Sequence, residues 1–103
     1  MDAAPDDARP WSNLGFARFE RAQFVEALQA FERAAELDAK VADAVGGRAI
    51  ALWRLGRAKE AKEAMTQAIT LDDRYGRVKD LREAAQWSDA QAQAAQELLA
   101  SIR

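Results

Sequence analysis

Hydrophobic residues recur along this chain with the period of an α-helix. In two segments they fall at the spacings i, i+3, i+4 and i+7 with polar side chains between them, which is typical of helices that bury one face. Short breaks at residues 22–23 and 56–57 separate each segment from a second helical segment before it, so the pattern predicts pairs of helices. The periodic positions are Phe24, Ala27, Leu28, Phe31, Ala34 and Ala35 in the first segment and Ala58, Ala61, Met65, Ala68 and Ile69 in the second.

The whole pattern repeats after 34 residues, which is the length of one helix pair. A third copy continues the series, so we expect three antiparallel helix hairpins near 10–37, 42–71 and 74–102. They would form a single domain over residues 10–103, with repeats at about 8–41, 42–75 and 76–103, after a flexible acidic leader over residues 1–9. Coinciding residues are Ala17 with Ala51, Ala27 with Ala61 and Ala95, Phe31 with Met65 and Leu99, Ala34 with Ala68 and Ile102, and Leu37 with Leu71.

This series resembles the tetratricopeptide repeat, whose signature of aromatic, Leu-Gly and small residues has the same period. The resemblance is close over residues 8–75 and looser over 76–103, and it implies an all-α fold, a right-handed α-solenoid. The chain departs from the family at Arg18, where a tyrosine is usual, at Arg48, where a leucine is usual, and at Ala39 and Asp73, which replace the closing proline. The residues that carry the resemblance are Trp11, Leu14, Gly15, Ala17, Phe24, Ala27, Phe31 and Ala34, followed by Val45, Ala49, Ala51, Leu52, Gly56, Ala61, Met65, Ala68, Leu71 and Asp72.

The third unit departs most from the pattern. The apolar residues of its first helix (Tyr75, Val78, Leu81 and Ala85) fall one residue early. Ser88 and Gln91 then form a capping-box pattern that predicts a helix over 88–102, with Ala92, Ala95, Leu99 and Ile102 as its apolar stripe and Gln91 among its flanking polar residues. We interpret this unit as a degenerate repeat that caps the array. Trp87, directly before Ser88, is expected to act as the hydrophobic staple of that helix rather than as a rung of an aromatic ladder with Trp53.

The first helix of each pair carries a second apolar stripe beside its core stripe. The resemblance implies that this stripe faces a concave groove, because first helices line that side of the solenoid. The leading hypothesis is a non-catalytic adaptor that binds a peptide or partner helix there. The alternative is that these side chains pack against each other or against the last helix pair. The candidate residues are Phe16, Phe19, Ile50 and Trp53 for apolar contact and Asn13, Glu20, Arg54 and Arg77 for polar contact.

A subset of the family grips the C-terminal carboxylate of chaperone tails with a clamp of Lys, Asn and Arg residues. At the matching positions this chain has Ser12, Phe16, Gly47, Arg77 and Leu81, of which Arg77 alone fits. The expected partner is therefore a protein or peptide of another kind. Gly46 and Gly47 suggest either a bare groove floor or a frayed helix start, because each glycine costs a helix about 1 kcal/mol.

A self-assembling module is the alternative from a different functional class. Short solenoids leave two flat ends, and an end that is not polar enough can stack on a second copy. Trp11 and Phe24 lie near the first edge and would make that contact. The expected oligomeric state is a monomer or a weak homodimer.

Composition argues against catalysis and against metal or cofactor chemistry. The chain has no cysteine and no histidine, so it lacks thiol nucleophiles, the commonest general base and the usual transition-metal ligands. Its formal net charge is -2, and the mild basic bias around Arg74, Arg77, Lys79 and Arg82 is better explained as a solvated surface than as a nucleic-acid footprint. No stretch is apolar enough for a membrane span or a signal peptide, so we expect a cytoplasmic protein that binds no membrane.

Overall fold

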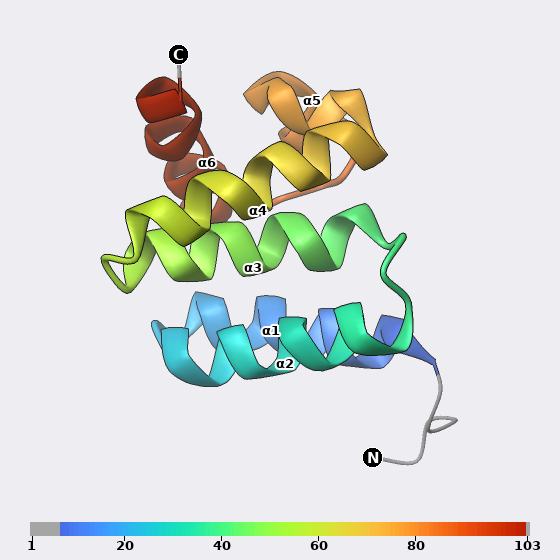
Figure 1. Cartoon of the computed structure of the whole chain (residues 1–103). Helices are drawn as coiled ribbons and strands as arrows, with labels where there is room; N and C mark the ends of the chain where they lie inside the picture. The colour runs from blue at the N-terminus through green and yellow to red at the C-terminus, as the bar shows by residue number, and fades with distance from the viewer. Residues whose placement is uncertain (1–6, 103) are drawn as a thin grey trace.

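The computed structural model describes residues 7–102, and that part of the chain consists of helices, turns and short connections without a strand. The prediction of an all-α fold is confirmed (Figure 1). Two long hairpins, α1–α2 and α3–α4, stack on each other, and a shorter third unit follows. The elements are α1 (Ala8–Glu20), α2 (Phe24–Leu37), α3 (Ala42–Arg54), α4 (Ala58–Leu71), the 3-10 helix η1 (Asp73–Gly76), α5 (Val78–Glu83) and α6 (Asp89–Ile102).

Helix α1 begins earlier than the sequence pattern suggests. Asp7 is its N-cap, and one carboxylate oxygen accepts a hydrogen bond from the backbone N–H of Arg9 at 3.0 Å. Pro10 lies in the first turn, where its missing N–H breaks no intrahelical bond. The predicted leader over 1–9 is therefore too long, since Ala8 and Arg9 are helical. Residues 1–6 of that leader lie outside the described residues.

The turns inside the first two hairpins have the same geometry, 34 residues apart. Ala22 has φ 58° and Gly56 has φ 80°, both in the left-handed region. The next residue in each turn closes it, as the N–H of Gln23 donates to the Arg18 carbonyl at 3.0 Å and that of Arg57 to the Leu52 carbonyl at 3.0 Å. The predicted repeat thus extends to the backbone of the turns, although one turn places an alanine where glycine is favoured.

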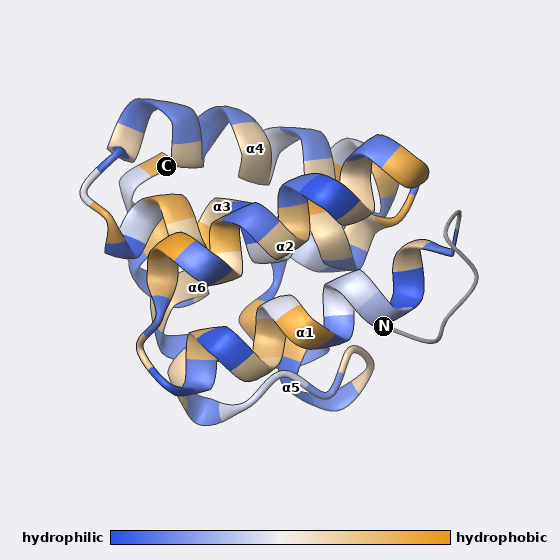
Figure 2. Cartoon of the chain, turned by 90° about the horizontal axis from the view of Figure 1, so that it is seen from below, coloured by the Kyte–Doolittle hydropathy of each residue, from blue (hydrophilic) through white to orange (hydrophobic). Residues whose placement is uncertain are grey.

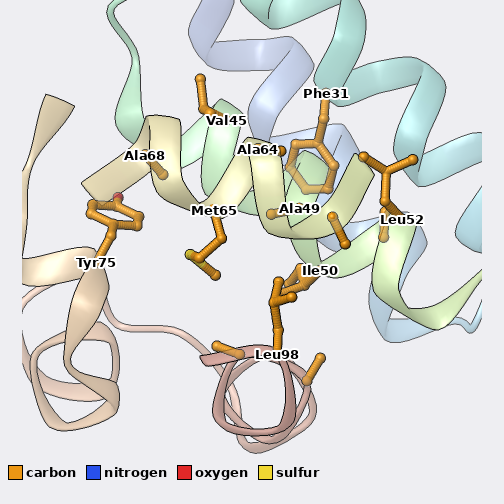
Figure 3. Close-up of a cluster of buried hydrophobic side chains, with 14 of the residues drawn as sticks. Phe31, Val45, Ala49, Ile50, Leu52, Ala64, Met65, Ala68, Tyr75 and Leu98 are labelled. Carbon is orange, nitrogen blue, oxygen red and sulfur yellow. The ribbon is translucent and has the colours of Figure 1, made fainter. Parts of the chain in front are cut away.

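The core of the two long hairpins is built around the fully buried ring of Phe31 (Figure 3). A Cβ added to Gly15 would lie 2.6 Å from this ring and one added to Gly47 would lie 2.3 Å from it, so a larger residue at either position would clash with the ring. A Cβ on Gly46 would lie 2.9 Å from the ring of Tyr75. Both expectations for Gly46 and Gly47 are wrong. They lie inside α3 rather than at a frayed start, and aromatic rings of the chain itself cover them.

The third unit is interrupted where a continuous first helix was expected. Helix η1 ends at Gly76, Arg77 has extended backbone, and α5 is only 6 residues long. Its predicted apolar residues are nevertheless in the core, since Tyr75 and Leu81 are buried and Val78 and Ala85 are half-buried. Helix α6 then crosses the array and contacts α1, α3 and α4 as well as α5. Figure 2 shows hydrophobic segments of α1, α3 and α6 beside one another.

Candidate functional site: the concave groove

Helix α6 lies on the candidate residues of α1 and α3. It buries a broad face, and the side chain of Leu98 points at Ile50 on α3 (Figure 3). This face extends beyond the predicted stripe, because Ala94 and Leu98 are fully buried while Ile102, at the end of the stripe, is exposed. The buried residues of α6 are Gln91, Ala92, Ala94, Ala95, Leu98 and Leu99.

The four apolar candidate residues belong to the core in this arrangement. Ile50 is 0% exposed and Phe19 is 3% exposed, with its ring centroid 5.1 Å from that of Phe24. Phe16 and Trp53 are half-buried against the same cluster. In the chain without a partner, these residues therefore pack against the last helix pair, which is the alternative raised above. A partner can reach Ile50 and Phe19 only when the covering segments move.

Trp53 and Arg54 meet a carboxylate of α6. The indole N–H of Trp53 donates to Oε1 of Glu97 at 3.1 Å, and the guanidinium of Arg54 donates to the same oxygen at 2.8 Å. The other oxygen of Glu97 accepts from the amide of Gln93 at 3.0 Å. Hydrogen bonds from Gln93, Trp53 and Arg54 lower the pKa of Glu97 to about 2. The carboxylate is therefore charged over the whole physiological range.

Glu20 contacts the N-terminal end of α6. Its carboxylate accepts from the hydroxyl of Ser88 at 2.9 Å and from the amide of Gln91 at 3.4 Å. The predicted capping box is confirmed, because the backbone N–H of Gln91 donates to the Ser88 hydroxyl at 3.2 Å and that of Ser88 donates to the Gln91 side chain at 3.0 Å. The expectation that Gln91 is on the polar face is wrong, since it is 6% exposed and turned towards Glu20.

Asn13 and Arg77 do not join this group. Asn13 is exposed on α1, and its side chain forms no hydrogen bond within the described part of the chain. Arg77 pairs with Asp80 on α5 and lies 3.8 Å from Asp73. The other two arginines of the basic segment are also paired, Arg74 with Asp72 and Arg82 with Asp89.

Trp87 and Tyr75 fill the part of the groove above Gly46, and sequence reasoning missed this contact. The ring of Trp87 lies 5.5 Å from that of Phe16 and 5.8 Å from that of Tyr75. Its indole N–H donates to Asp43 at 3.3 Å, and the Tyr75 hydroxyl donates to the same carboxylate oxygen. Burial raises the pKa of Tyr75, and its hydrogen bond to Asp43 raises it further. The signal in the sequence was the glycine at position 46, which leaves room for two rings.

Other kinds of site find little support among residues 7–102. No group of three or more acidic side chains there is arranged to hold a metal ion. No helix in that range has the length and apolar character needed to cross a bilayer.

A family model described as Tetratricopeptide repeat matches residues 18–85, from the last turn of α1 to just beyond α5. No curated protein matches the chain. The matched range includes Trp53 and Arg54 but ends before α6.

Proposed function

Because this chain belongs to the tetratricopeptide repeat family, whose repeats generally mediate protein–protein interaction, we propose that it is an interaction module that holds a peptide or partner helix in its concave groove. The observation that carries this proposal is that an amphipathic helix, α6, is seated on that face. The family is generally non-catalytic, and we extend this property to the chain.

The groove has the makeup of a helix-binding surface. Its floor is apolar, with Ile50 and Phe16, and its edge carries a tryptophan and an arginine, two residue types that are enriched at binding hot spots. The buried apolar residues of α6 are three alanines and two leucines. Because alanine side chains are small, α6 buries less apolar surface in the groove than a helix with larger side chains would. A partner helix with larger anchors would therefore compete well for the same seat.

In the bound state the candidate residues divide into two groups. Phe16, Phe19, Ile50 and Trp53 would provide the apolar contact. Asn13, Glu20, Arg54 and Arg77 would orient the ligand through polar contacts, with Glu20 and Arg54 released from their partners on α6.

Locking α6 in place tests this proposal. The chain has no cysteine, so Glu20→Cys with Ser88→Cys introduces a unique pair of thiols at two side chains that touch. A short thiol-to-thiol linker then fixes the start of α6 to the end of α1. We expect the bridged protein to lose the partners that wild type captures from a native extract, because α6 cannot leave the groove.

The matched control is the same double variant with both thiols alkylated and no bridge. It lacks the Glu20 carboxylate as the bridged form does, so it should retain more of those partners than the bridged form, and the difference between the two forms reports the lock on α6. If the bridged and alkylated forms capture the same proteins to the same extent, the groove beneath α6 is not the binding surface. Thermal unfolding of both forms checks that neither has lost its fold.

A second candidate function is self-assembly through the outer face of the first hairpin. Trp11 and Leu14 of α1 line a shallow hollow there with Ala30 of α2, and Val25 at the start of α2 is 51% exposed. A mass that rises with concentration in wild type and stays monomeric in Val25→Lys would support this candidate. A strictly monomeric mass of wild type at high concentration would exclude it.

A further inference from the structure

Trp53 and Arg54 form a small receptor for one carboxylate. They are adjacent residues in the last turn of α3, and both of their donors converge on Oε1 of Glu97. Neither side chain makes another hydrogen bond within the described part of the chain. An indole N–H and a guanidinium can donate but cannot accept, so the occupant must supply an acceptor oxygen, and the positive charge of the guanidinium favours an anionic one.

The electrostatics agree with the geometry. The side chain of Arg54 is 27% exposed and that of Glu97 is 38% exposed, so the pair is partly shielded from water and salt. The pKa of Glu97 falls to about 2 through hydrogen bonds from Gln93, Trp53 and Arg54. Two of these three donors belong to the groove, which therefore favours the charged form of a carboxylate on the helix it holds.

Next to this carboxylate site, the groove surface that α6 covers accommodates small residues followed by a leucine. Ala94, Ala95 and Leu98 of α6 are 0% exposed, and Leu98 points at Ile50 (Figure 3). Small side chains let two helix backbones approach closely, and the leucine supplies one apolar anchor. The seat thus specifies residues on both sides of the carboxylate.

The connection to α6 is suited to release. It spans residues 84–88, and within it Gln86 has φ 60°, a left-handed conformation that costs a non-glycine residue about 1 kcal/mol. The helix on the other side of this connection, α5, has only 6 residues. Release of α6 would expose Ile50 and neighbouring core residues, but it would leave the direct contacts between the two long hairpins in place.

We propose that Trp53 and Arg54 recognise a glutamate on a partner helix, which displaces α6 by presenting the same pattern as Ala94-Ala95-Gln96-Glu97-Leu98: two small residues, any residue, a glutamate and a leucine. This inference rests on the proposed function and adds the chemistry of the partner to it. Helix α6 is then the intramolecular competitor that sets how much of the groove is free.

The experiment uses synthetic peptides of residues 88–102 added to the full chain. In the Glu97→Lys chain, the introduced charge faces Arg54 and loosens its own α6. In the Arg54→Glu chain, the introduced carboxylate repels Glu97 with the same effect. Binding of fluorescently labelled peptides to each chain is measured by anisotropy, and hydrogen exchange of α6 shows whether it has left the groove.

We expect a reciprocal preference. The Glu97→Lys chain should bind the native peptide about tenfold more tightly than the Glu97→Lys peptide, and the Arg54→Glu chain should reverse that order. Wild type should bind the native peptide more weakly than the Glu97→Lys chain does, because its own α6 competes at a high effective concentration.

The matched control is a peptide in which Gln96 and Glu97 are exchanged. It has the same composition and net charge, but its carboxylate is turned by about 100° around the helix. It should bind the Glu97→Lys chain about as weakly as the Glu97→Lys peptide. Equal binding of all peptides by both chains would overturn recognition of the carboxylate and leave the proposed groove function intact.

Two further outcomes would overturn the proposed groove function as well. If α6 leaves both variant chains and no peptide binds to either, the groove does not hold a helix and the proposed function falls as well. If α6 stays protected in both chains, it is a fixed part of the fold, and the inference and the proposed groove function fall together. If two copies of the chain exchange their α6 helices in a dimer, the occupant of the groove is a second copy, and the proposal of a different partner protein is overturned.

Discussion

Phe31 shows how single residues determine the spacing of the helices. Its ring is fully buried, and both Gly15 of α1 and Gly47 of α3 approach it closely. Both glycines are points of close approach to this ring rather than flexible points, although they are 32 residues apart and so do not coincide in the 34-residue repeat. Sequence reasoning assigned Gly47 to a groove floor or a helix start because a glycine does not reveal which ring lies against it.

Gly47→Ala should destabilise the protein by about 2 kcal/mol. The added methyl would lie 2.3 Å from the Phe31 ring. That ring has little room to move, because it is fully buried and its centroid lies 4.8 Å from that of Phe16. Overpacking of this kind costs about 1–3 kcal/mol, which exceeds the gain of up to about 1 kcal/mol from replacing a helical glycine by alanine. Thermal unfolding should show a melting temperature about 10 °C lower.

Gly76→Ala is the matched control for this prediction. A Cβ at that position would lie 3.7 Å from its nearest neighbour, Ile69, which is ordinary contact. We expect a change within about 0.5 kcal/mol. A Gly47→Ala protein as stable as this control would show that the ring of Phe31 can shift.

At the scale of elements, α6 was predicted better as a helix than as a contact. Its start was confirmed by the Ser88–Gln91 capping box, since local hydrogen bonds depend on residues close in sequence. Its position in the groove depends on Glu97, whose carboxylate accepts hydrogen bonds from Arg54 and Trp53, which lie 43 and 44 positions earlier in the sequence. The predicted apolar stripe was too narrow. Six positions of α6 are buried, and five of them are alanine or leucine. This wide apolar face in the sequence was the available sign that α6 contacts more than one neighbouring helix.

The hydrogen bonds that Trp53 and Arg54 donate to Glu97 on α6 should contribute less to stability at acidic pH. The pKa of Glu97 is lowered from its ordinary value of 4.5 to about 2, so its charge stabilises the folded chain fully above about pH 4.5. That contribution is lost as the pH falls towards 2. It should amount to about 1 kcal/mol or less, because both members of the Arg54–Glu97 pair are partly exposed.

Melting temperatures of wild type and Glu97→Gln between pH 6 and pH 2 measure this effect. Other carboxylates titrate in the same range in both proteins, so the difference between the two curves isolates Glu97. We expect wild type to be the more stable protein at pH 6 and the two curves to converge near pH 2. Curves that stay parallel would mean that Glu97 contributes nothing through its charge.

At the scale of the whole molecule, stability should be unevenly distributed. Helix α3 is buried from Ala44 to Gly47 and again from Ala49 to Leu52, between the two long hairpins. Helix α6 follows a short connection and is seated mainly through alanines. We expect the backbone amides of α6 to exchange with solvent at least about tenfold faster than those of α3, as measured by native-state hydrogen exchange. Equal protection of both helices would mean that the chain opens as one unit.

The sequence by itself determined the two long hairpins, the 34-residue period and the capped start of α6. These features follow from helical periodicity and from hydrogen bonds between near neighbours, which any chain segment carries with it. The tertiary structure decided what covers the apolar stripe of α1 and α3. A helical pattern shows that a face is apolar, but it does not show which of several apolar faces it meets. That choice was made by contacts between distant residues, Glu97 with Arg54 and Trp87 with Phe16.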